Sequence, residues 1–265
     1  MTVEFVDIEC DGQSVRIEHA WVGSDDGKHP LIVFLHEGLG SLSMWRDFPQ
    51  RLCEAAACRG LVYSRPGYGR SGARTSPLGP DFMHRQAQQV LPTLLAALGV
   101  HAGKPWLFGH SDGGSIALLH AAHWPNQAAG AIVLAPHVMV EDLTLASIAQ
   151  ARQAYLETDL RSKLARHHAD PDSAFRGWND IWLDPDFCDW NIEAEISAIA
   201  CPLLAVQGLN DEYGSLEQID RIARRVKGSE SLVLADCGHS PHRDQPAALI
   251  KACTDFIQRH SGDPR

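Results

Sequence analysis

The sequence has no long apolar segment, and no stretch approaches the 18 uninterrupted apolar residues of a membrane-spanning helix. We therefore expect no interaction with a membrane. The opening segment, MTVEFVDIECDGQSVRIEHAWVG, contains acidic residues and no apolar core, so it is not expected to be a signal peptide. Internal repeats and low-complexity tracts are also missing.

Paired cysteines are missing as well. The seven cysteines, at positions 10, 53, 58, 188, 201, 237 and 253, form no C-x-x-C pair, and their number is odd. This usage is typical of reduced thiols and predicts a cytoplasmic protein. The His167-His168 pair lacks the spacing to cysteines or carboxylates that a metal site needs. We expect no metal and no cofactor.

Basic character is low, with 23 Lys and Arg against 33 Asp and Glu and a net charge of −10. Such a chain would repel phosphate groups, so nucleic acid is not an expected partner. The 265 residues are 45% hydrophobic and 21% charged, which is typical of a soluble globular enzyme.

The order of patterns along the chain predicts an α/β fold. Residues 2–22 alternate like a hairpin with a turn at Asp11-Gly12. Apolar, β-branched runs such as PLIVFLHEGLG and AAGAIVLAPHV then alternate with helical patterns up to the end of the chain. This alternation predicts a doubly wound, mostly parallel sheet of about eight strands.

One segment breaks the alternation before the last two strands. Residues 138–198 favour helix and are rich in aromatics, without a strand-like run. We interpret this segment as a helical cap between two parts of an α/β core, 1–137 and 199–265. Ligands bind at the carboxyl ends of parallel strands, which such a cap would cover. The alternative is a second packing layer without a functional role.

The stretch WLFGHSDGGSIALLHAAHWP contains the pentad Gly-His-Ser-Asp-Gly, with Ser111 at its centre. It lies where a strand-like run gives way to a helical pattern. A nucleophilic serine needs a sharp strand-to-helix turn of this kind, and flanking glycines allow the close backbone approach. Ser111 is therefore the candidate nucleophile. The alternative is a serine that caps a helix.

A serine hydroxyl needs a base, and the base needs an acid. His239 follows the last apolar strand, and His242 is its rival. Asp211 follows the preceding strand, and the adjacent Glu212 is its rival. The order Ser, Asp, His along strand ends is typical of this architecture.

Acyl transfer also needs donors for a developing oxyanion. The backbone N–H of Asp112, the residue after Ser111, is one candidate. Gly38 in the turn HEGLG is the other.

Five segments, FLHEGLG, SRPGYGRS, GHSDGG, GLNDEYG and CGHSPHRDQP, resemble in order the landmark loops of the α/β-hydrolase family. The resemblance covers nearly the whole chain and is greatest to the capped branch of carboxylesterases, lactonases and meta-cleavage-product hydrolases. It implies an α/β-hydrolase fold and a triad of Ser111, Asp211 and His239. It also implies oxyanion donors at Gly38 and Asp112. A serine at 111 favours ester-type chemistry over that of haloalkane dehalogenases or epoxide hydrolases, which carry aspartate there.

Two positions depart from the family pattern. The usual H-G-x-P-G turn is His-Glu-Gly-Leu-Gly here, with Glu37 beside the oxyanion site. We expect its side chain to point away from the pocket and to bond backbone donors, and a substrate contact is the alternative. Ser64 stands where many relatives have aspartate, and we infer nothing catalytic from it.

The cap supplies candidates for a substrate pocket. Trp178 and Trp182 are four residues apart and would share one face of a helix. If that face lies over Ser111, the pocket is apolar and suits an aromatic or medium acyl group. His137 and Trp45 are further candidates, and the alternative for the aromatic cluster is ordinary core packing.

The sequence thus predicts a carboxylesterase-type serine hydrolase acting on a small-molecule ester or lactone. Hydrolysis of a carbon–carbon bond in a ring-cleavage product is the alternative within the same class. A non-catalytic small-molecule receptor on the same fold is the alternative of another class. A homo-oligomer is left open by the sequence.

Overall fold

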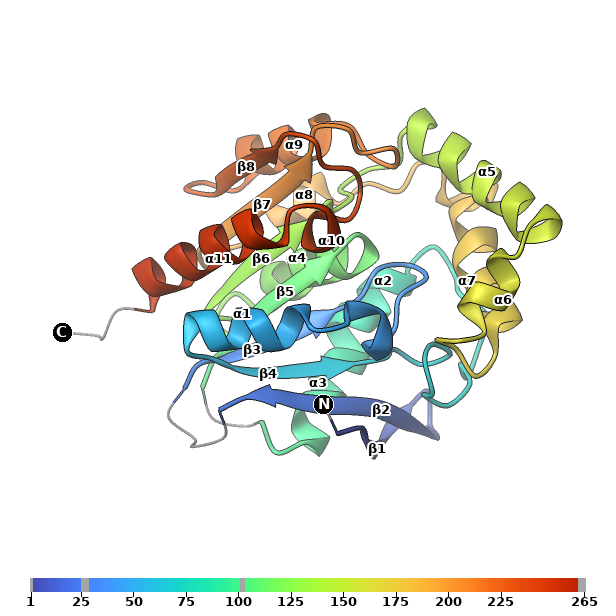
Figure 1. Cartoon of the computed structure of the whole chain (residues 1–265), viewed down its shortest axis with the longest axis horizontal. Coiled ribbons are helices and arrows are strands. Elements are labelled where there is room, and N and C mark those ends of the chain that lie inside the picture. Colours follow the sequence, from blue (N-terminus) through green and yellow to red (C-terminus); the bar gives the residue numbers. More distant parts are fainter. Residues whose placement is uncertain (1, 25–28, 101–102, 262–265) are drawn as a thin grey trace.

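A computed structural model describes residues 2–24, 29–100 and 103–261, and in these ranges the chain forms one eight-stranded sheet with helices on both faces (Figure 1). The order of the strands across the sheet is β1-β2-β4-β3-β5-β6-β7-β8. The strands are β1 (Glu4–Cys10), β2 (Gln13–Gly23), β3 (Leu31–Leu35), β4 (Arg59–Tyr63), β5 (Trp106–His110), β6 (Gly130–Leu134), β7 (Leu203–Gly208) and β8 (Glu230–Leu234).

The predicted hairpin is confirmed. β1 and β2 pair antiparallel from Cys10 opposite Gln13, with Asp11 and Gly12 between them. Both turn residues have positive φ, +51° and +71°, as a two-residue hairpin turn of this kind requires. β2 also pairs antiparallel with β4, whereas β3 to β8 are joined by parallel pairing. The expected mostly parallel, doubly wound sheet is therefore confirmed.

Alternate residues of the central strands face two separate hydrophobic cores. Ile32 and Phe34 of β3 pack with side chains of α1 (Phe48–Ala56) and α11 (Pro246–His260). Val33 and Leu35 face the opposite side. The helices that cover this second side are α2 (Phe82–Arg85), the π-helical turn η2 (Gln86–Val90), α3 (Leu91–Ala97), α4 (Asp112–His123) and α9 (Glu217–Arg225).

The helical insertion lies between β6 and β7, as expected. Its helices are α5 (Asp142–Glu157), α6 (Leu160–Leu164), α7 (Pro171–Trp182), η3 (Pro185–Phe187) and α8 (Glu193–Ile196). In Figure 1, α5, α6 and α7 stand together on the right, beyond the carboxyl ends of the parallel strands. α8 instead packs on α4 and α9 of the core. The division into 1–137, 138–198 and 199–265 stays a prediction, and residues 1, 25–28, 101–102 and 262–265 lie outside the described residues.

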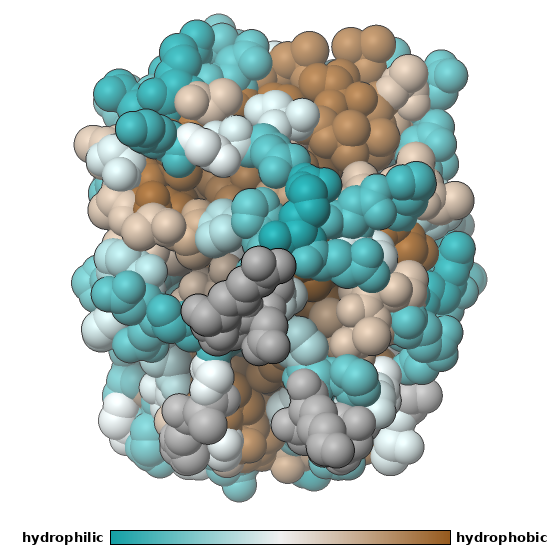
Figure 2. All heavy atoms as spheres, turned by 90° about the vertical axis from the view of Figure 1, so that its left-hand side faces the viewer, coloured by the Kyte–Doolittle hydropathy of each residue, from teal (hydrophilic) through white to brown (hydrophobic). Residues whose placement is uncertain are grey.

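The face turned away from the cap carries mostly polar side chains with several apolar areas between them (Figure 2). All seven cysteines are free thiols. In the ranges that the structure covers, no helix is both long and apolar enough to cross a membrane. Those ranges also contain no cluster of three His, Cys, Asp or Glu side chains able to hold a metal ion.

Candidate active site

Ser111 occupies a strained turn between β5 and α4. Its φ of +53° and ψ of −120° lie in a region that side-chain-bearing residues rarely adopt. Glycines on both sides make the turn possible. A Cβ at Gly109 would lie 2.1 Å from the carbonyl oxygen of Gly113, and one at Gly113 would lie 2.0 Å from that of Leu35. The pentad thus forms the sharp strand-to-helix turn that the sequence predicts.

The predicted serine, histidine and aspartate are joined by a continuous chain of hydrogen bonds. Ser111 Oγ is 3.0 Å from His239 Nε2, and His239 Nδ1 is 2.9 Å from both carboxylate oxygens of Asp211. The alternative of a helix-capping serine is not supported, because the Ser111 side chain makes no capping bond to α4. The three residues follow β5, β7 and β8, and parallel strands bring their carboxyl ends to one edge of the sheet.

Asp211 is fixed as an ionised acceptor. Its Oδ1 accepts from the backbone N–H groups of Tyr213 and Gly214, at 2.8 and 3.2 Å, and its Oδ2 accepts from Gln207 Nε2 at 2.6 Å. Burial by itself would raise the pKa of Asp211. The hydrogen bond and charge of His239, together with the Tyr213 N–H, outweigh it and lower that pKa. A carboxylate held in this way orients the imidazole and stabilises its protonated form.

The two rival residues have other positions. His242 lies on α10 (Pro241–Asp244) and packs against the ring of Trp45, with ring centroids 4.9 Å apart. Burial holds the pKa of His242 well below its usual value, and in the described part of the chain neither ring nitrogen has a hydrogen-bond partner. Glu212 Oε2 accepts from the backbone N–H of His239 at 3.2 Å, so this side chain holds the histidine loop.

Gly38 and Asp112 both line the cavity that contains Ser111. Among the described residues, neither backbone N–H donates to another group, so both are free for an oxyanion. Gly38 also has no room for a side chain, because a Cβ there would lie 2.1 Å from Cδ1 of Trp178. The cap residue Trp178 therefore packs directly on the predicted oxyanion turn.

The cavity at Ser111 measures about 150 Å³ and lies between the sheet edge and the cap. Of the predicted pocket residues, Glu37, His137, Trp178 and Trp182 line it. Six further residues, which were not predicted from the sequence, also line it, namely Leu39, His110, Thr144, Ile148, Tyr213 and Ser240. Thr144 and Ile148 stand four apart on α5, and Tyr213 follows the predicted acid by two residues. Helical spacing and proximity to Asp211 were the available signals for these three.

Trp45 does not line this cavity, contrary to the prediction. Its ring is buried in the core on the α1 and α11 side, against Phe34, Phe48 and Phe108. The short 3₁₀ helix η1 (Leu42–Trp45) after the HEGLG turn directs the side chain to that face of the sheet.

The expectation for Glu37 also needs correction. Its carboxylate faces side chains rather than backbone donors, with Oε2 3.5 Å from His110 Nδ1 and Oε1 3.4 Å from Arg243. Burial by itself would raise the pKa of Glu37. The hydrogen bond and charge of His110, with the charges of His242 and Arg243, hold it well below its usual value.

The polar groups of the cavity give it little positive charge. No Lys or Arg is among its described lining residues. Burial lowers the pKa of His137 to about 3, so this imidazole is neutral near pH 7. Burial also raises the pKa of Asp112, although Arg65 lies behind the cavity wall with its guanidinium 3.8 Å from Oδ2. The charge of Arg65 thus partly offsets the cost of burying the Asp112 carboxyl group, and Arg65 is not among the residues that line the cavity.

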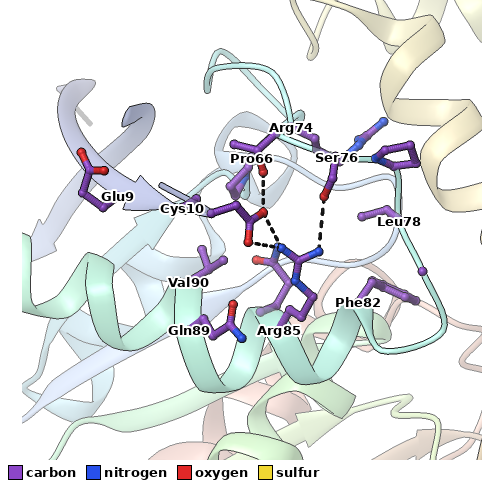
Figure 3. A pocket seen from close by; sticks show the side chains of 15 residues that line it. Glu9, Cys10, Pro66, Arg74, Ser76, Leu78, Phe82, Arg85, Gln89 and Val90 are labelled. Atoms are coloured by element: carbon purple, nitrogen blue, oxygen red, sulfur yellow. Dashed lines mark hydrogen bonds and ion pairs between the residues drawn. The ribbon is translucent and has the colours of Figure 1, made fainter. Parts of the chain in front are cut away.

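A second cavity, of about 80 Å³, lies away from these residues (Figure 3). It is bounded by the β1–β2 turn, the segment 74–79 and η2. Its polar wall is an ion pair between Asp11 and Arg85, joined by Thr75 and Ser76. This cavity shares no lining residue with the one at Ser111, so the predicted chemistry does not involve it.

Comparison with known proteins is consistent with this geometry. The model of the alpha/beta hydrolase family matches residues 32–252. A 2-hydroxy-6-oxononadienedioate/2-hydroxy-6-oxononatrienedioate hydrolase of Klebsiella pneumoniae is 21% identical over 97% of this chain and 96% of its own.

Two solved structures share the fold. A thermophilic esterase from Thermogutta terrifontis superposes with a TM-score of 0.76 at 18% identity, covering 99% of this chain and all of its own. An enol-lactonase from Burkholderia xenovorans LB400 gives 0.75 at 19% identity, over 96% of this chain and all of its own.

Proposed function

The chain belongs to the alpha/beta hydrolase family, and from this membership we propose that it is a serine hydrolase of carboxylic esters or lactones. The observation that carries the proposal is the continuous chain of hydrogen bonds Ser111–His239–Asp211 on the wall of a largely apolar cavity beneath the cap. A nucleophile, a base and an acid to orient the base are the minimum for acyl transfer at neutral pH.

In the proposed reaction, Ser111 Oγ forms a bond to the substrate carbonyl carbon while its proton passes to His239 Nε2. The negative charge that develops on the carbonyl oxygen accepts hydrogen bonds from the N–H groups of Gly38 and Asp112. Collapse of this intermediate breaks the bond to the leaving oxygen, which takes the proton from His239. Water then attacks the acyl-enzyme by the same route and releases the acid and Ser111.

The cavity supports a neutral substrate with a small to medium acyl group. A space of about 150 Å³ is enough for a group the size of benzene. Trp178, Trp182 and Ile148 supply apolar walls for such a group. We place the alkyl or aromatic part of the substrate against these three side chains.

Carbon–carbon bond hydrolysis is the second candidate, and the Klebsiella pneumoniae relative named for a dienedioate favours it. The charge of the cavity argues against it. A dicarboxylate would enter a space whose described walls include the carboxyl groups of Glu37 and Asp112 and no lysine or arginine. Desolvating an anion there without a cation would be costly.

The test is hydrolysis of p-nitrophenyl esters, from acetate to long acyl chains, by the wild type and Ser111→Ala. We expect wild-type turnover with a short to medium optimum and a fall of about 10⁴-fold or more in the variant. Ser229→Ala, at a serine directly before β8 and outside the lining of the cavity, is the matched control and should keep full activity. Turnover of dienoates without ester turnover would favour the second candidate. Ligand-induced thermal stabilisation without any product would indicate a receptor.

A further inference from the structure

His110, the residue before the nucleophile, contacts the loop that carries the base. Its ring is only 1% exposed, and Nε2 lies 2.6 Å from the backbone carbonyl oxygen of His239. A carbonyl oxygen only accepts hydrogen bonds, so Nε2 of His110 carries a proton and donates it. The same histidine whose imidazole faces Ser111 is therefore held through its backbone.

The other ring nitrogen of His110 faces a carboxylate. Nδ1 lies 3.5 Å from Oε2 of Glu37, and it has no other partner in the described part of the chain. In a neutral ring with Nε2 protonated, Nδ1 would present a lone pair to the carboxylate, and two acceptors cannot bond. A proton on Nδ1 turns the contact into an ion pair. The Glu37 carboxylate thus lies beside the ring that is bonded to the backbone of His239.

Glu37 has a second basic neighbour, which lies on α10. Its Oε1 lies 3.4 Å from the guanidinium of Arg243, which also donates to the carbonyl oxygen of Met44. The Glu37 side chain is 16% exposed. The other titratable groups that act on Glu37, or on which it acts, are Asp112, His36, His167, His168 and His242.

These contacts connect three loops of the site. Glu37 precedes the oxyanion glycine Gly38, His110 precedes Ser111, and the carbonyl of His239 belongs to the base. The aromatic contact between His110 and His239, with ring centroids 5.2 Å apart, adds to the connection. A shift of His110 would therefore move the base relative to the nucleophile.

We propose that Glu37 and His110 are positioning residues for His239, and that they hold its imidazole at bonding distance from Ser111. The inference rests on the proposed function. It assigns a role to the carboxylate at position 37, and this role does not require that Glu37 touch the substrate. Misplacement of a catalytic group by about 1 Å can cost about 100-fold in rate, so the effect is measurable.

Two variants separate the charge from the contact. Glu37→Gln keeps the shape, and its amide can donate to Nδ1 of a neutral His110, so the bond survives without the charge. We expect kcat to fall about tenfold with KM within about twofold. His110→Phe removes both contacts and should lower kcat by about 100-fold.

His120→Phe is the matched control. His120 is equally buried at 1% exposure and also bonds a backbone carbonyl, that of Ala87, at 2.8 Å. It lies on α4 away from the described cavity lining. A change of kcat in the Glu37 and His110 variants that only equals the change in His120→Phe would show a general packing role and overturn the proposal.

A readout independent of substrate completes the test. The proton of His239 Nδ1, bonded to Asp211, should give a low-field resonance that is absent in His239→Gln. Its loss or shift in Glu37→Gln and His110→Phe, with no change in His120→Phe, supports positioning. An unchanged resonance overturns it. If the wild type hydrolyses no ester, the proposed function fails, and this resonance still decides the positioning role.

Discussion

The indole Nε1 of Trp182, on the last turn of α7 in the cap, donates a hydrogen bond of 3.1 Å to the carboxyl of Asp112, the residue that follows Ser111. Trp182 is 1% exposed, and the other carboxyl oxygen of Asp112 faces Arg65 at 3.8 Å. The cap is thus bonded to the first residue of α4, whose backbone N–H is a predicted oxyanion donor. This bond links the cap directly to the residue beside the predicted nucleophile.

Replacing Trp182 with Phe should lower the free energy of unfolding by about 2 kcal/mol at pH 7, because a buried carboxyl loses its hydrogen-bond donor. The pKa of Asp112 is already raised by burial, so its ionised form costs stability as pH rises above the unfolded value of 3.8. The variant raises the pKa of Asp112 further. The difference in unfolding free energy between wild type and variant should therefore grow between pH 4 and pH 7. Urea unfolding at both pH values measures this change.

Trp45→Phe is the control for that experiment. It removes the same volume from a buried site whose indole N–H has no partner in the part of the chain that the structure describes. The loss of unfolding free energy in Trp45→Phe should be smaller than in Trp182→Phe and independent of pH. Equal pH dependence in the two variants would contradict the role assigned to the Trp182–Asp112 bond.

The sequence predicted the parts of the site that depend on local pattern. Gly109 is required by the close approach of the Gly113 backbone within the turn itself, and the pentad predicts this turn at Ser111. Asp211 and His239 follow apolar strands, and parallel topology brings such strand ends together. Periodicity and order along the chain were enough for these positions.

The direction in which a side chain points depends on packing between segments that are distant along the chain. The sequence was not sufficient to predict this direction for Trp45 and Glu37. Trp45 comes soon after the oxyanion turn, yet its ring enters the opposite core. Glu37 pairs with residues 73 and 206 positions away along the chain, His110 and Arg243. No local pattern encodes such pairs, because each exists only after β3, β5 and α10 have assembled.

Asp211→Asn should lower kcat by about 10⁴-fold, because the amide favours the wrong tautomer of His239. It should also change stability with pH. The pKa of Asp211 is lowered in the folded state, despite the opposing effect of burial, so its charge stabilises the fold above the unfolded pKa of 3.8. This contribution is lost as pH falls through the folded pKa. The difference in unfolding free energy between wild type and variant should therefore be larger at pH 7 than at pH 3.

A matched control for that pair of measurements is Asp255→Asn, an exposed carboxylate on α11 that contacts Lys251. It should leave kcat unchanged and stability nearly so, since exposed pairs contribute about 0–1 kcal/mol. If Asp211→Asn kept most of the wild-type kcat, Asp211 would not be the acid of the site.

Gly38→Ala should lower kcat/KM by about 100-fold, because its Cβ would lie 2.1 Å from Trp178 and must displace either the indole or the oxyanion turn. Trp178→Ala creates the room for that methyl group. The double variant should therefore recover part of the loss and be more active than the product of the two single effects implies. A double-mutant cycle on ester hydrolysis measures the coupling. Additive effects would mean that the cap tryptophan does not restrict the turn.

Helix α5 of the cap also bonds the acid loop, the loop after β7 that carries Asp211. Thr144 Oγ1 donates to the carbonyl oxygen of Tyr213 at 2.6 Å, and Ser147 Oγ donates to that of Glu212 at 2.5 Å. The backbone N–H of Tyr213 donates in turn to Asp211, so a shift of α5 would also shift the Asp211 carboxylate. We expect Thr144→Val, which keeps the shape of the side chain, to lower the free energy of unfolding by about 1 kcal/mol.

The same substitution should lower kcat/KM by about tenfold, since the carbonyl of Tyr213 loses its donor and the loop that orients Asp211 is released. Thr93→Val removes a similar bond, from Thr93 Oγ1 to the carbonyl oxygen of Gln89 at 2.7 Å, on an exposed part of α3. This control should keep full activity. Unfolding and ester kinetics of both variants decide the matter. A stability loss at Thr144 without a loss of kcat/KM would mean that α5 packs on the acid loop without holding Asp211 in place.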